Sequence, residues 1–180
     1  MKKEKIVQKF ENFLDEALYL RCRTTARDKY YKGEQCLKTH RCWQASLVAD
    51  SAPVLIYDVK GEPELYNDIV KTIREKIDVE FETATINFYY WTRYSYIPWH
   101  NDGHAAGAVS IYLNPDWNPN YGGYLLYKED DEIKAILPEK NVAVFQANGL
   151  HHGTTPVNFA GDIRYSIQCF LEKGRNKGPY

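Results

Sequence analysis

Six short segments with the character of β-strands follow one another between residues 83 and 172, and this pattern restricts the fold more than any other feature. Each segment is rich in β-branched and aromatic residues, and turn-forming residues occupy nearly every gap. Short strands at fairly regular spacing favour a β-sandwich or a jelly roll (double-stranded β-helix) over alternating βαβ units. The segments are 84–91, 108–113, 124–127, 133–137, 142–146 and 164–171.

Two amphipathic helices are predicted ahead of these strands. Residues 4–20 and 62–77 each carry apolar side chains at helical spacing. We expect both helices to pack on the major sheet, which gives a mostly β fold with supporting helices. The apolar stripes consist of Phe10, Phe13, Leu14, Ala17 and Leu18 in the first helix and of Leu65, Ile69, Ile73 and Ile77 in the second.

A single domain is expected, because 180 residues match one ordinary domain and no linker rich in Pro, Gly or Ser divides the chain. Within it, residues 1–82 form a helical support region, residues 83–172 the jelly-roll core and residues 173–180 a C-terminal tail. The 14% aromatic share, with 15 tyrosines, predicts an aromatic-rich interior.

Charge and hydropathy argue against two classes of partner. The 23 basic and 24 acidic side chains nearly cancel, so no overall field attracts nucleic acid or an anionic membrane. Residues 1–5 begin like a signal peptide, but Gln8, Lys9, Glu11 and Asn12 stand where its apolar stretch belongs. No segment has the length of a membrane span. We therefore expect a cytoplasmic protein.

The four cysteines are too few and too scattered to suggest a disulfide framework, so reduced thiols are expected. Cys36, His40 and Cys42 do cluster, and with Cys22 they could supply four soft ligands. Their spacing matches no common structural zinc pattern, which makes a zinc site there the less favoured interpretation. Cys169 lies far from the cluster in the sequence.

The clearest candidate for chemistry is a His-X-Asp triplet at His100 and Asp102. Two residues apart at a strand end, these side chains can point to the same side and share a metal. Such a triplet often arises by chance, so a third ligand is needed, and His152 follows a later apolar strand. Two imidazoles and one carboxylate suit iron(II), because they leave three coordination positions for a bidentate cosubstrate and O2. A closed zinc site would leave none.

Five pieces of sequence match a known family in order, and together they cover residues 84 to 172. This part of the chain resembles the core of an iron(II)- and 2-oxoglutarate-dependent dioxygenase of the prolyl-4-hydroxylase-like branch. The resemblance implies Fe(II), 2-oxoglutarate and O2 as cofactors, with ascorbate as a candidate reductant. The pieces are the His100/Asp102 triplet, the strand Ser110–Asn114, the pair Gly122–Gly123, the segment His152–Val157 and the closing strand Arg164–Ile167.

The same resemblance implies which residues hold the cosubstrate. Arg164 should bind its C5 carboxylate, and a guanidinium fork does match a carboxylate in bidentate geometry. Ser166, two residues along the strand, shares the side of Arg164, and Tyr112 should reach the same carboxylate. Tyr90 has two interpretations that we weigh equally, a contact to the cosubstrate and an ordinary core aromatic.

The choice of His152 over the adjacent His151 rests on the family's His-X-X-X-Pro register, which Pro156 completes. Neighbouring strand residues point to opposite sides, so only one of the two histidines can be the ligand. A departure from the family is the slightly long distance from His152 to Arg164, which an insertion at residues 158–162 would absorb. His104, between Gly103 and Gly107, is expected in a loop beside the substrate opening.

The resemblance implies hydroxylation of an unactivated C–H bond, with a prolyl or other residue of a peptide or protein as the favoured substrate and succinate and CO2 as coproducts. Asp102 favours hydroxylation because related halogenases lack this carboxylate. The alternative substrate is a free amino acid or a small natural product. A nucleic-acid demethylase is less favoured, because Phe170 replaces the second arginine that such enzymes carry. The alternative outside this class is a non-enzymatic β-barrel that binds a ligand.

Two further segments bear on the substrate. The run 91–99 leading to His100 is rich in aromatic residues and could line a peptide groove, although ordinary packing explains such runs as well. The acidic residues 129–132 are expected in a solvated hairpin turn, with attraction for basic substrates as the minor interpretation.

Overall fold

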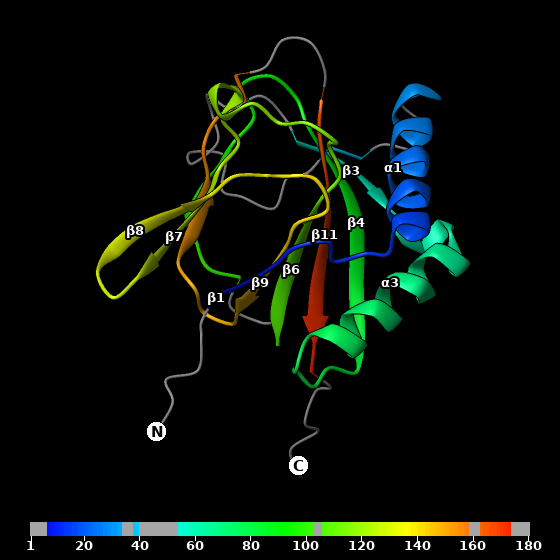
Figure 1. Ribbon diagram of the computed structural model, residues 1–180, viewed down its shortest axis with the longest axis horizontal. Helices are drawn as coiled ribbons and strands as arrows, with labels where there is room; N and C mark the ends of the chain where they lie inside the picture. The colour runs from blue at the N-terminus through cyan, green and yellow to red at the C-terminus, as the bar shows by residue number, and fades with distance from the viewer. Residues whose placement is uncertain (1–6, 34–37, 40–53, 103–105, 159–162, 174–180) are drawn as a thin grey trace.

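Two antiparallel sheets and a layer of helices make up the fold (Figure 1). The structure is a computed structural model that describes residues 7–33, 38–39, 54–102, 106–158 and 163–173. Within these residues the larger sheet has seven strands, in the order β1-β9-β6-β11-β4-β3-β2. The smaller sheet has four, in the order β5-β10-β7-β8. The predicted mostly β fold with supporting helices is confirmed.

The strands of both sheets are short, as their sequence pattern predicts. Those of the larger sheet are β1 (Val7–Phe10), β2 (Lys38–Thr39), β3 (Val54–Asp58), β4 (Thr83–Trp91), β6 (Gly107–Tyr112), β9 (Ala143–Ala147) and β11 (Arg164–Glu172). Those of the smaller sheet are β5 (Ile97–His100), β7 (Leu125–Glu129), β8 (Glu132–Ile136) and β10 (His152–Thr154). The helical elements are α1 (Glu16–Tyr31), α3 (Pro63–Lys76) and two short 3-10 turns, η2 (Val59–Gly61) and η3 (Pro119–Tyr121).

The central strand β11 separates two environments, because successive side chains of a strand point to opposite faces. One set enters the hydrophobic core and consists of Tyr165, Ile167, Cys169 and Leu171. The other set faces a cavity and consists of Arg164, Ser166, Gln168 and Phe170. The register between β11 and its neighbours therefore decides which residues of β4 and β6 join the cavity.

Helices α1 and α3 cover the core side of the larger sheet. Their buried residues share one hydrophobic cluster with β4, β6, β9 and β11. A tyrosine from each helix also hydrogen-bonds to the backbone outside the helices. The hydroxyl of Tyr19 in α1 donates to the carbonyl of Leu113 at 2.9 Å, and that of Tyr66 in α3 donates to the carbonyl of Ala84 at 2.7 Å. Helix α3 follows the predicted range 62–77 closely.

The first predicted helix, over residues 4–20, is wrong for residues 7–15. Val7–Phe10 form strand β1, which pairs antiparallel with β9. Helix α1 starts only at Glu16, where the carboxylate of Asp15 accepts a hydrogen bond from the backbone N–H of Leu18 at 2.8 Å and so caps the helix.

The connection between β1 and α1 explains this difference. Asn12 has a φ of 49°, which interrupts any regular helix. Asn141 then ties Leu14 from both sides, since its amide oxygen accepts from the N–H of Leu14 at 3.0 Å and its amide nitrogen donates to the carbonyl of Leu14 at 2.8 Å. Phe13 and Leu14 are buried without being helical, so their apolar stripe reflects tertiary packing.

The segment before residue 83 contributes strands as well as helices. Strand β3 pairs with β4 across its whole length, and β1 extends the sheet at the opposite edge. The support region is therefore part of the larger sheet, not a purely helical layer.

Cys22 and Cys169 are buried free thiols, and burial raises the pKa of Cys22 to about 12. Cys36, His40 and Cys42 lie outside the described residues.

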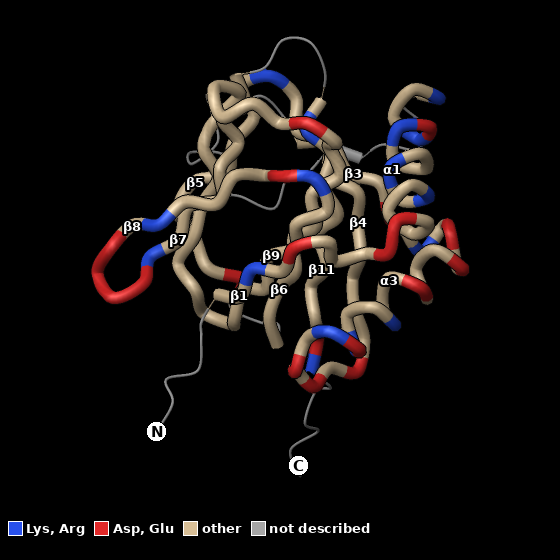
Figure 2. The backbone as a smooth tube through the Cα atoms, viewed as in Figure 1, with Lys and Arg blue, Asp and Glu red and all other residues tan. Residues whose placement is uncertain are grey.

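The acidic residues 129–132 form the turn of the β7–β8 hairpin, as predicted. Asp130 and Asp131 have φ values of 49° and 66°. A two-residue type I′ hairpin turn requires such positive φ values at both of its central residues. Figure 2 shows this acidic tip projecting from the body of the molecule.

None of the helices in the described ranges is long and apolar enough to cross a membrane.

Candidate metal centre and cosubstrate pocket

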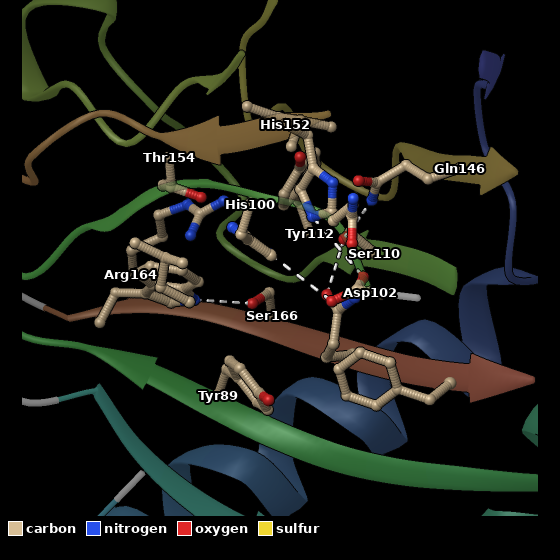
Figure 3. Close-up of a pocket in the computed structure, with 16 residues that line it drawn as sticks. Tyr89, His100, Asp102, Ser110, Tyr112, Gln146, His152, Thr154, Arg164 and Ser166 are labelled. Atoms are coloured by element: carbon tan, nitrogen blue, oxygen red, sulfur yellow. Dashed lines mark hydrogen bonds and ion pairs between the residues drawn. The ribbon is translucent and has the colours of Figure 1, made fainter. Parts of the chain in front are cut away.

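A cavity of about 370 Å³ opens between the two sheets. Strand β11 lines it with Arg164, Ser166, Gln168 and Phe170, and the ends of β5 and β10 line it with His100 and His152 (Figure 3). Pockets of this size are typical of small-molecule sites. The predicted metal ligands and most of the predicted contacts to the cosubstrate line this one cavity.

The three predicted metal ligands come together. His100 ends β5 and lies directly opposite His152 on the antiparallel neighbour β10. The Nε2 atom of His100 is 3.5 Å from Oδ1 of Asp102, and Nε2 of His152 is 3.6 Å from Oδ2 of the same carboxylate. Ligand atoms of all three lie within 4.8 Å of one another, a grouping that could hold one metal ion.

Both imidazoles are held in the form that binds a metal through Nε2. The Nδ1 atom of His100 is 2.7 Å from the carbonyl of Pro98, and that of His152 is 3.0 Å from the carbonyl of Leu150. A carbonyl can only accept, so each Nδ1 must carry a proton, and in the neutral tautomer the lone pair is then on Nε2, which faces the cluster. Backbone carbonyls two residues earlier thus orient both rings.

Burial also favours the neutral form of His152. It lowers the pKa of His152 below 6.5, and the neighbouring His100 lowers that pKa further. A neutral imidazole is the form that ligates a metal.

The adjacent His151 is exposed and does not line the cavity. His104 and most of the predicted insertion at 158–162 lie outside the described residues.

Arg164 lies at the other end of the cavity with its guanidinium buried. The side chain is 2% exposed, and its guanidinium carbon is 4.6 Å from the centre of the Trp91 ring and 5.0 Å from that of Tyr112. Burial lowers the pKa of Arg164 to about 10, so the group remains a cation at neutral pH. Among the described residues no carboxylate pairs with this cation.

Several buried donors around Arg164 have no acceptor among the residues that the structure describes. Its Nε and Nη1 atoms and the hydroxyl of Tyr112 find no hydrogen-bond partner within the described part of the chain. Burial also raises the pKa of Tyr112, which keeps the phenol protonated. Unsatisfied buried donors are costly, and a carboxylate entering the cavity would satisfy them.

Ser166 faces the same end, as predicted from its spacing. Its oxygen accepts a hydrogen bond from the indole Nε1 of Trp91 at 3.0 Å, so its own proton is available for an acceptor in the cavity. The sequence left open whether Trp91 lines a peptide groove or packs inside the fold, and the structure buries it against Arg164 and Ser166. Its direct opposition to Arg164 in the β4–β11 register produces this contact, and register cannot be read from one sequence.

Gly123 makes room for Arg164. Its φ is 69°, and a Cβ built there would lie 2.9 Å from Cδ of Arg164. The neighbouring Gly122 is equally restricted, since its Cβ would fall 2.1 Å from the carbonyl oxygen of Pro156. The Gly122–Gly123 pair thus has a packing role beside the predicted carboxylate anchor.

Tyr90 lies in the core, which favours the second of its two interpretations, an ordinary core aromatic, over a contact to the cosubstrate. It is fully buried in the helix-side cluster, with its ring 5.3 Å from that of Tyr30 and 5.9 Å from that of Tyr165. The neighbouring Tyr89 and Trp91 line the cavity instead. Since Tyr90 pairs with Tyr165, which faces the helices, the period of the strand turns both rings away from the site.

The residues present fit Fe(II) and 2-oxoglutarate. Two neutral imidazoles and a carboxylate are the facial ligand set of non-haem iron, with positions left open. The buried cation and unpaired hydroxyl at Arg164 and Tyr112 fit the far carboxylate of a dicarboxylic cosubstrate. The two groups share one cavity.

Comparisons with known proteins agree with this chemistry. The family model described as "2OG-Fe(II) oxygenase superfamily" matches residues 84–172. A comparison with curated protein sequences finds no significant match.

Three solved structures share the fold at low sequence identity. A prolyl-4-hydroxylase from Pseudomonas putida has a TM-score of 0.73 at 16% identity, covering 95% of this chain and 94% of that chain. A prolyl hydroxylase from Trichoplax adhaerens, in complex with a hypoxia inducible factor peptide fragment, has a TM-score of 0.76 at 15% identity, covering 94% and 84%. The viral collagen prolyl hydroxylase of Paramecium Bursaria Chlorella virus-1, in complex with 2OG, has a TM-score of 0.66 at 16% identity, covering 96% and 98%.

The chain belongs to the 2OG-Fe(II) oxygenase superfamily, and its jelly-roll fold resembles that of the prolyl 4-hydroxylases. It is a 2-oxoglutarate-dependent dioxygenase, and the cofactors of this family are Fe(II), 2-oxoglutarate and O2. The predicted family and enzyme class are thereby confirmed, and a non-enzymatic β-barrel is set aside.

Proposed function

We propose that this enzyme hydroxylates an unactivated C–H bond in a prolyl or other residue of a peptide or protein, with succinate and CO2 as coproducts. The observation that carries the proposal is that the His100, Asp102 and His152 cluster shares one cavity with the buried Arg164. The similar folds of proteins named as prolyl hydroxylases support a prolyl substrate.

The residues divide into two groups by role. His100, Asp102 and His152 would hold Fe(II), and Arg164, Tyr112 and Ser166 would hold the C5 carboxylate of 2-oxoglutarate. Bound together, iron and 2-oxoglutarate supply the activation of O2 that a C–H bond requires. The protein orients the cosubstrate through the buried guanidinium and excludes water with the aromatic walls of the cavity.

A peptide substrate would approach over the aromatic segment that precedes His100. Tyr94 is 52% exposed and Trp99 41% exposed, so both present aromatic surface to the solvent. The guanidinium of the exposed Arg93 stacks 4.6 Å from the ring centre of Tyr94. A peptide with an extended backbone could pack on these rings. We therefore propose that the run 91–99 lines the peptide groove. Trapping a peptide is also what the Trichoplax structure, with its peptide fragment, suggests for a related fold.

A substrate screen tests the proposal. Purified protein with Fe(II), 2-oxoglutarate and ascorbate, the proposed reductant, should release succinate slowly alone and faster with a Pro-containing peptide, whose mass should rise by one oxygen atom. Stimulation by free proline or another amino acid, without stimulation by peptides, would replace the peptide proposal with the small-substrate alternative. Cytoplasmic residence stays a prediction that cell fractionation would check.

A further inference from the structure

Beyond the metal ligands, the cavity ends in a set of neutral polar side chains that the proposed function does not use. Gln168 lies four residues after Arg164 on the same face of β11, which is about 13 Å along a strand. Ser110 on β6 lies directly opposite Gln168 in the pairing of β6 with β11. Gln146 comes from β9, the strand on the other side of β6. Figure 3 shows Arg164 at one end of the cavity, Ser110 and Gln146 at the other, and the metal ligands between them.

The three side chains form a hydrogen-bonded row. The hydroxyl of Ser110 donates to Oε1 of Gln168 at 2.7 Å and accepts from Nε2 of Gln146 at 3.2 Å. Gln146 is 2% exposed, and its Oε1 is buried without a hydrogen-bond partner among the described residues. A buried acceptor without a donor costs free energy, so its presence in a cavity indicates a ligand donor.

The row presents an acceptor and a donor on opposite sides of Ser110, because β9 and β11 flank β6. Gln168 uses its oxygen for Ser110, which leaves its amide nitrogen as the group it offers to the cavity, while Gln146 offers its oxygen. A hydroxyl donates one hydrogen bond, so the two amides must turn opposite ends toward Ser110. Reversing both amides would exchange the two roles but would still leave one donor and one acceptor.

The chemistry around this row is neutral. Among the cavity-lining residues described, Asp102 and Arg164 are the charged side chains apart from histidine, and neither belongs to this row. Phe170 and Tyr89 supply the adjoining walls. Asp102 does line a small adjoining pocket with Gln146, but its carboxylate faces the two histidines of the metal cluster. A carboxylate group would find no counter-ion at this end, whereas a neutral group with one donor and one acceptor would be satisfied.

We infer that this end of the cavity binds an amide group of the substrate, with Gln146 accepting its N–H and Gln168 donating to its carbonyl. The inference rests on the proposed function and deepens it, since an amide next to the oxidised carbon indicates a peptide-like substrate instead of a free amino acid. The N–H and C=O of a trans amide point in opposite directions, and the two glutamines lie on the strands that flank Ser110, so one amide lying across Ser110 would reach both.

A binding experiment without turnover tests the subsite apart from the hydroxylation chemistry. The full chain, loaded with 2-oxoglutarate and with Zn²⁺ in place of iron, is titrated with N-acetylprolinamide and with N-acetylproline methyl ester, and binding is followed by NMR. The ester keeps the carbonyl but lacks the N–H. Wild type should bind the amide about tenfold more tightly, the effect of one hydrogen bond to a buried partner.

Variants assign the effect to the row. Of Gln146→Leu and Gln168→Leu, one should abolish the preference for the amide and the other should weaken both probes alike. Gln8→Leu, the same change on β1 outside the cavity, should keep the preference. Equal binding of both probes by wild type, binding of neither, or a preference retained in both cavity variants would overturn the subsite.

These outcomes are separate from the test of hydroxylation. A protein that shows the amide preference but hydroxylates no prolyl peptide keeps the subsite and rejects the prolyl substrate. A protein that hydroxylates prolyl peptides without the preference keeps the proposed function and rejects the subsite.

Discussion

The indole of Trp91 contacts Arg164 and Ser166 at once: its ring centre lies 4.6 Å from the guanidinium carbon of Arg164, and its Nε1 lies 3.0 Å from the hydroxyl oxygen of Ser166. One side chain therefore positions two of the proposed cosubstrate contacts. The register that places Trp91 opposite Arg164 is what brings them together.

Trp91→Phe should weaken the binding of 2-oxoglutarate without abolishing it. Phenylalanine keeps an aromatic face for the guanidinium but loses the N–H that holds Ser166. We expect the KM for 2-oxoglutarate to rise by about three- to tenfold, the effect of one neutral hydrogen bond. Succinate release at varied 2-oxoglutarate measures this. An unchanged KM would show that Trp91 does not orient Ser166 for the cosubstrate.

Arg164→Ala should have a larger effect on the same parameter. Removing the guanidinium leaves a carboxylate in the cavity without its cation, and losing such a charged hydrogen-bond pair costs about 2–5 kcal/mol. The requirement for 2-oxoglutarate should rise steeply while iron binding, measured by metal content after dialysis, is retained. A variant with wild-type dependence on 2-oxoglutarate would contradict the assignment of the anchor.

Gly123→Ala tests the close packing beside the anchor. The added Cβ would meet Cδ of Arg164 at 2.9 Å and would also place alanine at a φ of 69°. Both effects destabilise, by about 1–3 kcal/mol together, and the displaced guanidinium should raise the KM for 2-oxoglutarate. Thermal unfolding and succinate kinetics measure the two effects.

Gly149→Ala is the matched control for this change. Gly149 has a similar φ of 79°, but a Cβ there would meet nothing within 4 Å. The control should therefore lower the melting temperature through backbone strain alone. If both variants raised the KM equally, the contact with Arg164 would not be the cause.

The metal-free protein should lose stability as the pH falls below 6.5. His152 has a lowered pKa in the folded chain, so on acidification the unfolded chain takes up a proton first. This contribution to stability is present above the unfolded pKa of about 6.5 and is lost as the pH falls toward the folded pKa. Urea unfolding at several pH values should show a shallower pH dependence for His152→Gln. Parallel curves for the two proteins would contradict the burial argument.

The sequence predicts the features that depend on local pattern. The strand run, helix α3, the β7–β8 turn and the ligand spacing of His100 and Asp102 are all of this kind, and so is the pairing of Arg164 with Ser166 on one face. Tyr112 and the choice of His152 over His151 needed the family resemblance, because these residues come from strands distant from His100.

The features that depend on long-range register could not be predicted. Tyr90 turned out to face the core because β11 pairs it with Tyr165, and the same register brought Trp91 into the site. The first helix was placed too early, because Phe13 and Leu14 are buried through contacts with the distant Asn141. The row formed by Ser110, Gln146 and Gln168 spans three strands and has no local signal.

The most direct test of the central claim is succinate release from 2-oxoglutarate by wild-type protein and by Asp102→Ala. With Fe(II), ascorbate and O2, wild type should form succinate, slowly alone and faster with a substrate. Asp102→Ala should form none above background, because two imidazoles alone lose the carboxylate that both histidines face at 3.5 and 3.6 Å. Absence of succinate from wild type under all conditions, or equal rates from the two proteins, would contradict the account.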